Sequence, residues 1–152
     1  MAISAELIKK LREETGAPVV RVKKLLDEMN NDEKKVREIL MKEGFEKMEK
    51  RSDRETSEGR VVAYTHHTGK VAAMVELLCE TDFVGRNELF MELAKSIALQ
   101  IVSMNPADRD ELLAQEFIKD TSKTIEELIK EVTSKTGEVI RLGRFVRMEI
   151  GK

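Results

Sequence analysis

The chain has 152 residues, of which 41% are apolar and 37% charged, and its formal net charge is −2. This balance excludes the overall basic field typical of nucleic-acid-binding domains, and a single cysteine excludes an internal disulfide and fits a reducing compartment. There is no apolar run of about 18 residues that could span a membrane, and the charged N-terminus lacks an apolar signal core. We therefore expect a cytoplasmic protein.

Residues 1–45 are expected to form a bundle of three short helices. Ser4 is a suitable N-cap for the first helix, and Gly16 suits the left-handed position that ends it. The second helix follows Pro18, and the third begins after Asn30-Asn31 and is predicted to end at Gly44. The apolar side chains follow helical spacing in each: Leu7, Ile8 and Leu11; Val22, Leu25, Leu26 and Met29; Val36, Ile39 and Leu40. Such short helices can bury these faces only against one another.

Residues 46–60 are almost wholly polar, so we place a charged linker here, either helical or mobile. The rest of the chain, 61–152, is predicted to be one α+β domain. It opens with a β-hairpin whose strands are RVVAYTH and KVAAMVELLCE. In the second strand, one face carries Val71, Ala73, Val75, Leu77 and Cys79.

Two helices and a final strand are predicted after the hairpin. Asn87 caps a long helix that ends at Asn105-Pro106, and residues 107–123 are too mixed to assign. Thr124 begins a capping box for a helix that ends at Gly137. The last stretch alternates, with one face predicted to hold Ile140, Leu142, Val146, Met148 and Ile150. The simplest closed arrangement is a three-stranded antiparallel sheet with helices on one face.

A search for catalytic chemistry finds little. There is no phosphate-binding glycine motif, and HHTGKV lies in a hairpin turn rather than between a strand and a helix. The available metal-ligand types have poor spacing, since adjacent histidines on a strand point in opposite directions: His66, His67, Cys79, Glu80 and Asp82. The basic row of Arg141, Arg144 and Arg147 lacks the aromatic platforms of a nucleic-acid surface. We therefore expect no cofactor, no metal and no direct contact with nucleic acid.

The turn between the second strand and the long helix holds an unusual pair, Asp82-Phe83. In one reading, Phe83 folds back into the core and Asp82 caps the following backbone. In the other, Phe83 is exposed on a rigid strand-to-helix corner. A large aromatic presented in this way is typical of an interface anchor.

Four segments decide between the two readings. In chain order they are LREETGA at 11–17, KKLL at 23–26, CETDFVGRNELF at 79–90 and GEVIRLGRFVRMEIG at 137–151. Together they resemble the elongation factor Ts family, the bacterial guanine-nucleotide exchange factors for elongation factor Tu. The resemblance covers nearly the whole chain, and its most specific element is Thr81-Asp82-Phe83-Val84.

The resemblance implies a fold, a partner and a set of contact residues. The N-terminal bundle would be similar to ubiquitin-associated domains and would dock on the GTPase domain of elongation factor Tu, with contacts to a further domain. The matching residues in the bundle are Leu11, Arg12, Thr15, Gly16, Ala17, Lys23 and Lys24. The corner formed by Thr81, Asp82, Phe83 and Val84 would insert near the magnesium and phosphate end of the nucleotide pocket, so that GDP leaves without covalent chemistry.

The chain departs from the family pattern at several places. These are Pro18, Val19, Arg21, Leu78 and Gly85, together with 105–120, where family members usually carry a helical hairpin. Long members also hold two core halves in tandem, whereas short members complete the second half by pairing, which would make this chain a homodimer. Two other functions stay open: an adaptor that uses the bundle to bind another protein, and a metal-dependent hydrolase built from His66, His67 and Cys79.

Overall fold

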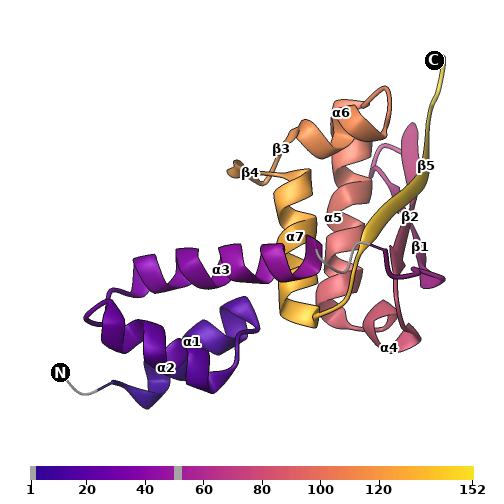
Figure 1. The fold of residues 1–152 in the computed structure, drawn as a ribbon. Coiled ribbons are helices and arrows are strands. Elements are labelled where there is room, and N and C mark those ends of the chain that lie inside the picture. The colour runs from indigo at the N-terminus through magenta and orange to yellow at the C-terminus, as the bar shows by residue number, and fades with distance from the viewer. Residues whose placement is uncertain (1–2, 50–52) are drawn as a thin grey trace. The chain divides into compact units, whose positions relative to one another are not determined.

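A computed structural model describes residues 3–49 and 53–152. The chain divides into two units, which we call the helical unit (Met1–Asp53 with Thr133–Glu138) and the sheet unit (Arg54–Val132 with Val139–Lys152). Figure 1 labels their elements. Within the described ranges, no helix has the length and apolar character needed to cross a membrane.

The helical unit contains the three predicted helices, α1 (Ala5–Thr15), α2 (Val19–Glu28) and α3 (Glu33–Glu49). The caps of α1 are confirmed: the Ser4 hydroxyl accepts a hydrogen bond from the Leu7 N–H, and Gly16 adopts φ = +72°. Among the described residues, the buried apolar side chains of this unit come from the predicted faces: Leu11, Val22, Leu25, Leu26, Val36 and Leu40. The helices therefore pack by the periodicity that the sequence shows.

The predicted end of the third helix was wrong. Helix α3 runs through Gly44 to Glu49, so the first residues of the predicted linker are helical, whereas 50–52 lie outside the described residues. A Cβ at Gly44 would lie 2.2 Å from the Ser134 hydroxyl oxygen, so this glycine allows a close approach and does not end the helix. At the other end of α3, Asp32 accepts a hydrogen bond from the Lys35 N–H.

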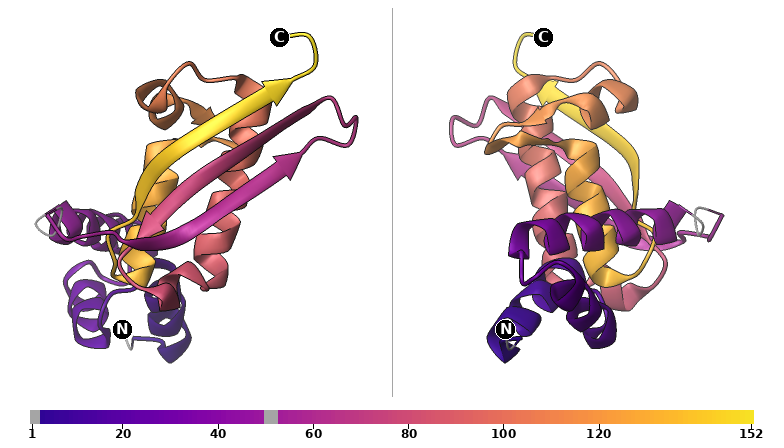
Figure 2. Two further views of the ribbon diagram at one scale, coloured as in Figure 1. Left: turned by 90° about the vertical axis from the view of Figure 1, so that its right-hand side faces the viewer. Right: turned by 60° about the vertical axis from the view of Figure 1, so that its left-hand side comes forward.

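The sheet unit is built on three antiparallel strands, as predicted, and their order is β1-β2-β5. These are β1 (Glu58–Thr65), β2 (Val71–Cys79) and β5 (Arg141–Glu149). Between β2 and β5 come α4 (Asp82–Gly85), α5 (Glu88–Met104), α6 (Arg109–Ala114), β3 (Glu116–Phe117), β4 (Asp120–Thr124) and α7 (Ile125–Thr136). Figure 2 (left) shows the sheet in front of α5 and α7, which lie on the same side of it.

One face of the sheet and the inner sides of these helices form the core. Strand β2 buries Ala73, Val75, Leu77 and Cys79, which confirms its predicted alternation. Helix α5 is capped by Asn87, whose side chain accepts a hydrogen bond from the Leu89 N–H, and ends at a left-handed Asn105. The core therefore fixes the two elements on either side of α4.

The predicted face of the last strand was wrong beyond Leu142. Val75 pairs with Phe145 and Leu77 pairs with Leu142, so β5 has one extra residue between these pairs. This β-bulge reverses which side chains face the core. Phe145 packs against the core, while Val146 and Met148, which were expected on the same face as Leu142, are 49% and 75% exposed.

Residues 107–123, left unassigned by the sequence, form α6 and most of a small hairpin of β3 and β4. The fully buried Gln100 of α5 holds this segment. Its amide donates to Gln115 Oε1 (3.2 Å) and to the Glu116 carbonyl (3.0 Å) and accepts from the Ile118 N–H (3.0 Å). These bonds satisfy the buried Gln100 amide, which would be costly to leave unpaired.

Candidate functional site

The α4 corner, residues Thr81–Gly85, is a single helical turn between β2 and α5. Thr81 caps it, because its hydroxyl accepts a hydrogen bond from the Val84 N–H at 3.4 Å. The Gly85 N–H donates to the Thr81 carbonyl at 3.2 Å, which closes the turn. The thiol of Cys79 donates to the same carbonyl at 3.1 Å. The corner is thus held by its own backbone and by the last buried residue of β2.

Phe83 lies at the exposed side of this corner. Its side chain is 89% exposed, whereas its neighbour Val84 is buried in the core at 9%. The exposure expected for Phe83 is confirmed, and the alternative in which it folds back into the core was wrong. Burial of a large aromatic ring is favourable, and the free chain leaves this ring in water. Such placement is typical of a side chain that is buried against a partner.

Asp82 is held by two arginines. Its Oδ1 accepts from Arg60 Nη2 at 2.9 Å, and its Oδ2 lies 2.8 Å from Arg86 Nε. The hydrogen bond from Arg60 is the main reason that the pKa of the Asp82 carboxyl lies below its usual value, and the charges of Arg86 and Arg60 lower it further. The carboxylate is therefore ionised at neutral pH, with its charge offset by the two guanidinium groups.

Glu80 holds the chain just before the corner. Its side chain is only 13% exposed, and its carboxylate accepts from the Val139 N–H at 2.7 Å and from Arg54 Nη1 at 3.2 Å. These contacts join the end of β2 to the segment before β5, through Val139, and to the segment before β1, through Arg54. Sequence reasoning considered Glu80 only as a metal ligand and missed this role.

The residues named for the N-terminal bundle fall into two groups. Leu11 and Thr15 are buried, and the Thr15 hydroxyl donates to the Leu11 carbonyl at 2.6 Å, so these side chains belong to the packing of the helical unit. Gly16 caps α1, and Ala17 packs against the core of the helical unit. The side chains that remain accessible are those of Arg12, Lys23 and Lys24.

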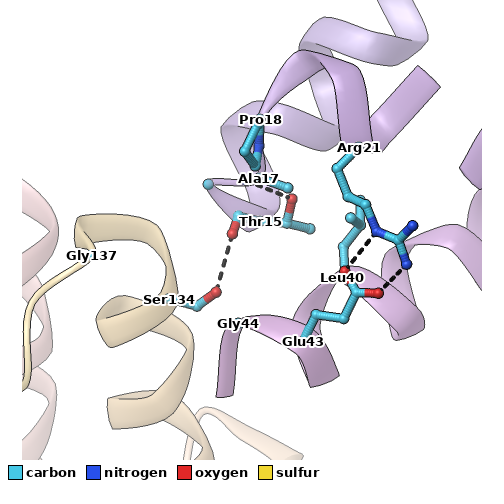
Figure 3. Close-up of a pocket in the computed structure, with 10 residues that line it drawn as sticks. Thr15, Ala17, Pro18, Arg21, Leu40, Glu43, Gly44, Ser134 and Gly137 are labelled. Atoms are coloured by element: carbon cyan, nitrogen blue, oxygen red, sulfur yellow. Dashed lines mark hydrogen bonds and ion pairs between the residues drawn. The ribbon is translucent and has the colours of Figure 1, made fainter. Parts of the chain in front are cut away.

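The helical unit also contains a pocket of about 180 Å³, drawn in Figure 3. Arg21 of α2 and Glu43 of α3 line it and form an ion pair. The hydrogen bond from Arg21 lowers the pKa of the Glu43 carboxyl. The Ser134 hydroxyl donates to the Thr15 carbonyl at 3.1 Å on another side of the pocket. The polar groups around the pocket therefore bind one another.

The outer face of the sheet, defined here by Val61, Met74, Val146 and Met148, is apolar. Their side chains are 66%, 49%, 49% and 75% exposed, respectively. A shallow hollow lies on this face and is lined by Val61, Met74 and Val146, with the ion pair of Glu76 and Arg144. The sequence did not reveal this surface, because it depends on the bulge in β5.

The three residues of the hydrolase hypothesis do not form one site. His66 and His67 lie at the turn between β1 and β2, where their ring centroids are 4.1 Å apart. Cys79 is buried at the far end of β2, which is about 26 Å away at the usual rise of a strand. Across the described residues, no group of three or more His, Cys, Asp or Glu side chains could hold a metal ion.

Comparison with known proteins gives a consistent result. A family model described as elongation factor TS matches residues 80–152. Elongation factor Ts of Leptospira biflexa is 40% identical over 196 aligned positions, covering 99% of each chain. That of Thermotoga maritima is 38% identical over 195 positions, covering 100% of this chain and 98% of the relative. That of Aquifex aeolicus is 44% identical over 154 positions, covering 98% of this chain but 53% of the relative.

The alignment lengths show that this chain is shorter than these relatives. The Leptospira alignment runs over 196 positions, against the 152 residues of this chain, so at least 44 positions have no counterpart here. The match covers 53% of the Aquifex relative, so nearly half of that relative lies outside it.

Proposed function

Because the chain belongs to the elongation factor Ts family, we propose that it binds elongation factor Tu with GDP and speeds release of the nucleotide. The α4 corner inserts near the magnesium and phosphate end of the nucleotide pocket. The chain then acts as a translation factor by non-covalent exchange rather than as an enzyme. We place this action in the cytoplasm, with no cofactor and no direct contact with nucleic acid or membrane.

The observation that carries this proposal is Phe83, which is 89% exposed on a corner whose flanking residues are buried or hydrogen-bonded. A ring on a mobile loop would move away from a resisting surface. A ring on this corner is supported by β2 on one side and α5 on the other. It can therefore displace groups of the partner rather than be displaced by them.

The energies involved are modest. Magnesium requires a nearly ideal octahedral shell, so a small shift of its supports weakens the bound nucleotide. A thousandfold faster release requires a barrier lower by about 4 kcal/mol. A single buried aromatic anchor supplies about 2–4 kcal/mol at an interface. Since coupling between two ligands is reciprocal, GDP weakens the factor as much as the factor weakens GDP.

The helical unit provides a second docking surface in this proposal. Arg12, Lys23 and Lys24 are accessible, and we assign them contacts with the GTPase domain of elongation factor Tu. Leu11, Thr15, Gly16 and Ala17 support these contacts by shaping α1 and the turn that follows it. Because the two units are covalently linked, binding of one raises the effective concentration of the other at the partner. A contact of the chain with a further domain of elongation factor Tu is part of the same proposal.

We also propose that two copies of the chain pair through the outer face of the sheet. The helices of the sheet unit cover only the opposite face (Figure 2, left). Val61, Met74, Val146 and Met148 make the uncovered face more apolar than a solvated sheet surface requires. A second copy would cover these side chains and complete the missing core half.

The proposal is tested by measuring, in a stopped-flow instrument, the rate at which fluorescently labelled GDP leaves elongation factor Tu. The proposal predicts that release accelerates with the concentration of the chain until it saturates. An unchanged rate at saturating chain would contradict it. If the chain bound a different protein instead and left release unchanged, the adaptor function would replace the exchange function.

A further inference from the structure

The Asp82 carboxylate binds two arginines that come from different parts of the fold. Arg60 lies on β1, opposite Leu77 of β2, and its Nη2 donates to Asp82 Oδ1 at 2.9 Å. Arg86 lies four residues after Asp82, at the end of the same helical turn. Of the two arginines, Arg60 is therefore the one that joins the α4 corner to the sheet by a contact between residues distant in the sequence.

The Arg60 guanidinium is itself held in place. Its Nη1 donates to the Gly59 carbonyl at 2.6 Å, and the side chain is 30% exposed. It also lies close against the corner, since a Cβ built on Gly85 would be 3.2 Å from Nη1 and 3.5 Å from Cζ. Two donors of one planar group thus bind the sheet backbone and the corner at the same time, a geometry that lysine cannot reproduce.

Arg86 is a weaker support. Its side chain is 75% exposed, and its ion pair with Asp82 has the i,i+4 spacing of a surface helix pair. Such pairs contribute little because both partners are solvated and screened. Arg86 also moves with the turn that contains Asp82, so it cannot set the orientation of that turn relative to the sheet.

We propose that Arg60 is a positioning residue for nucleotide exchange, which holds the α4 corner through Asp82 so that Phe83 meets the partner in one orientation. This inference rests on the exchange function proposed above. The lowered pKa of Asp82, for which the Arg60 hydrogen bond is the largest cause, agrees with a carboxylate that stays ionised and bound to Arg60. Arg60 acts through Asp82 and Phe83 and needs no contact with the partner.

The test measures the rate of GDP release from elongation factor Tu at a saturating concentration of the Arg60→Met variant. The matched control is Arg86→Met, which removes the other arginine that binds Asp82. We expect Arg60→Met to lower the maximal rate about fivefold, as for loss of a partly exposed, charge-assisted hydrogen bond. Arg86→Met should lower it by less than about twofold. Arg60→Lys keeps the charge but has a single donor nitrogen, so it should recover part of the loss. Thermal unfolding of each variant identifies a temperature at which all of them are folded, and the release rates are compared at that temperature.

A double-mutant cycle separates positioning from a general structural effect. If Arg60 acts through the ring, Arg60→Met should cause no further loss in a Phe83→Ala background. Additive losses would overturn the inference, and so would equal losses in Arg60→Met and Arg86→Met. A wild-type rate for Arg60→Met, with Phe83→Ala still impaired, would overturn this inference alone. Wild-type chain that does not accelerate release would instead overturn the exchange function.

If Arg60→Met does not fold, Arg60→Lys decides by itself. A single ammonium cannot bind Gly59 and Asp82 in the same planar arrangement, so its maximal rate should lie measurably below that of wild type. A rate equal to wild type would overturn the role assigned to the Arg60 guanidinium.

Discussion

Replacing Phe83 by alanine removes the ring that the α4 corner presents and leaves the corner itself in place. A phenylalanine side chain buries about 150–250 Å² when it is enclosed. Since Phe83 is 89% exposed in the free chain, almost all of this area is available to a partner. At about 25 cal/mol per Å² it corresponds to an upper limit of about 3–6 kcal/mol. Alanine keeps one carbon of the side chain, and ordering the ring has a cost, so we expect a loss of about 2 kcal/mol, or about thirtyfold in exchange rate.

The same exposure predicts that stability does not change. Phe83 contributes little to the core, so its truncation should alter the free energy of unfolding by less than about 0.5 kcal/mol. Val84→Ala is the matched control, because Val84 is buried and its truncation should destabilise the sheet unit. Stopped-flow GDP release gives the rate, and urea unfolding gives the stability. An exchange rate within threefold of wild type for folded Phe83→Ala would refute the reasoning from exposure.

Three further predictions concern other parts of the molecule. Gln100→Leu should lower the free energy of urea unfolding by about 2–3 kcal/mol, because it leaves the Glu116 carbonyl and the Ile118 N–H without their partner; unchanged unfolding would mean that the 115–118 segment is held otherwise. Met148→Asp should convert a dimer to a monomer in sedimentation equilibrium, and a dimer that persists would exclude the outer face of the sheet as the interface. The Glu43 pKa is lowered in the folded state by Arg21, so this pair stabilises the fold at pH above about 4.5 and its contribution is lost as the pH falls through the lowered value. When the pH falls below 4.5, the melting temperature of Glu43→Gln should therefore decrease less than that of wild type. Identical pH profiles of the two proteins would contradict the assignment.

The helices and the central strands followed from the sequence because their signals are local. The Ser4 and Asn87 caps and the alternation of β2 depend only on neighbouring residues, and all were confirmed. The exposure of Phe83 did not follow from local signals, which left two readings open; the resemblance of four segments to the elongation factor Ts family decided between them. The role of the exposed ring is a proposal that local patterns alone cannot test.

Features that depend on distant residues were missed. The bulge in β5 reverses the face of Val146 and Met148, and the side chain of Glu76 on β2 lies against it. Glu76 accepts a hydrogen bond from the Arg144 N–H, and a Cβ at Gly143 would lie 2.4 Å from its Oε1. Gly143 and the charged Arg144 within an apolar alternation were the available signals. The Arg60–Asp82 bond joins residues 22 positions apart and leaves no trace in local spacing.

A crystal structure of the chain bound to nucleotide-free elongation factor Tu tests the central claim most directly. The account predicts that the Phe83 ring is buried against the magnesium and phosphate end of the nucleotide pocket, with Asp82 still bound to Arg60. A complex in which the α4 corner faces solvent, away from that pocket, would contradict the account.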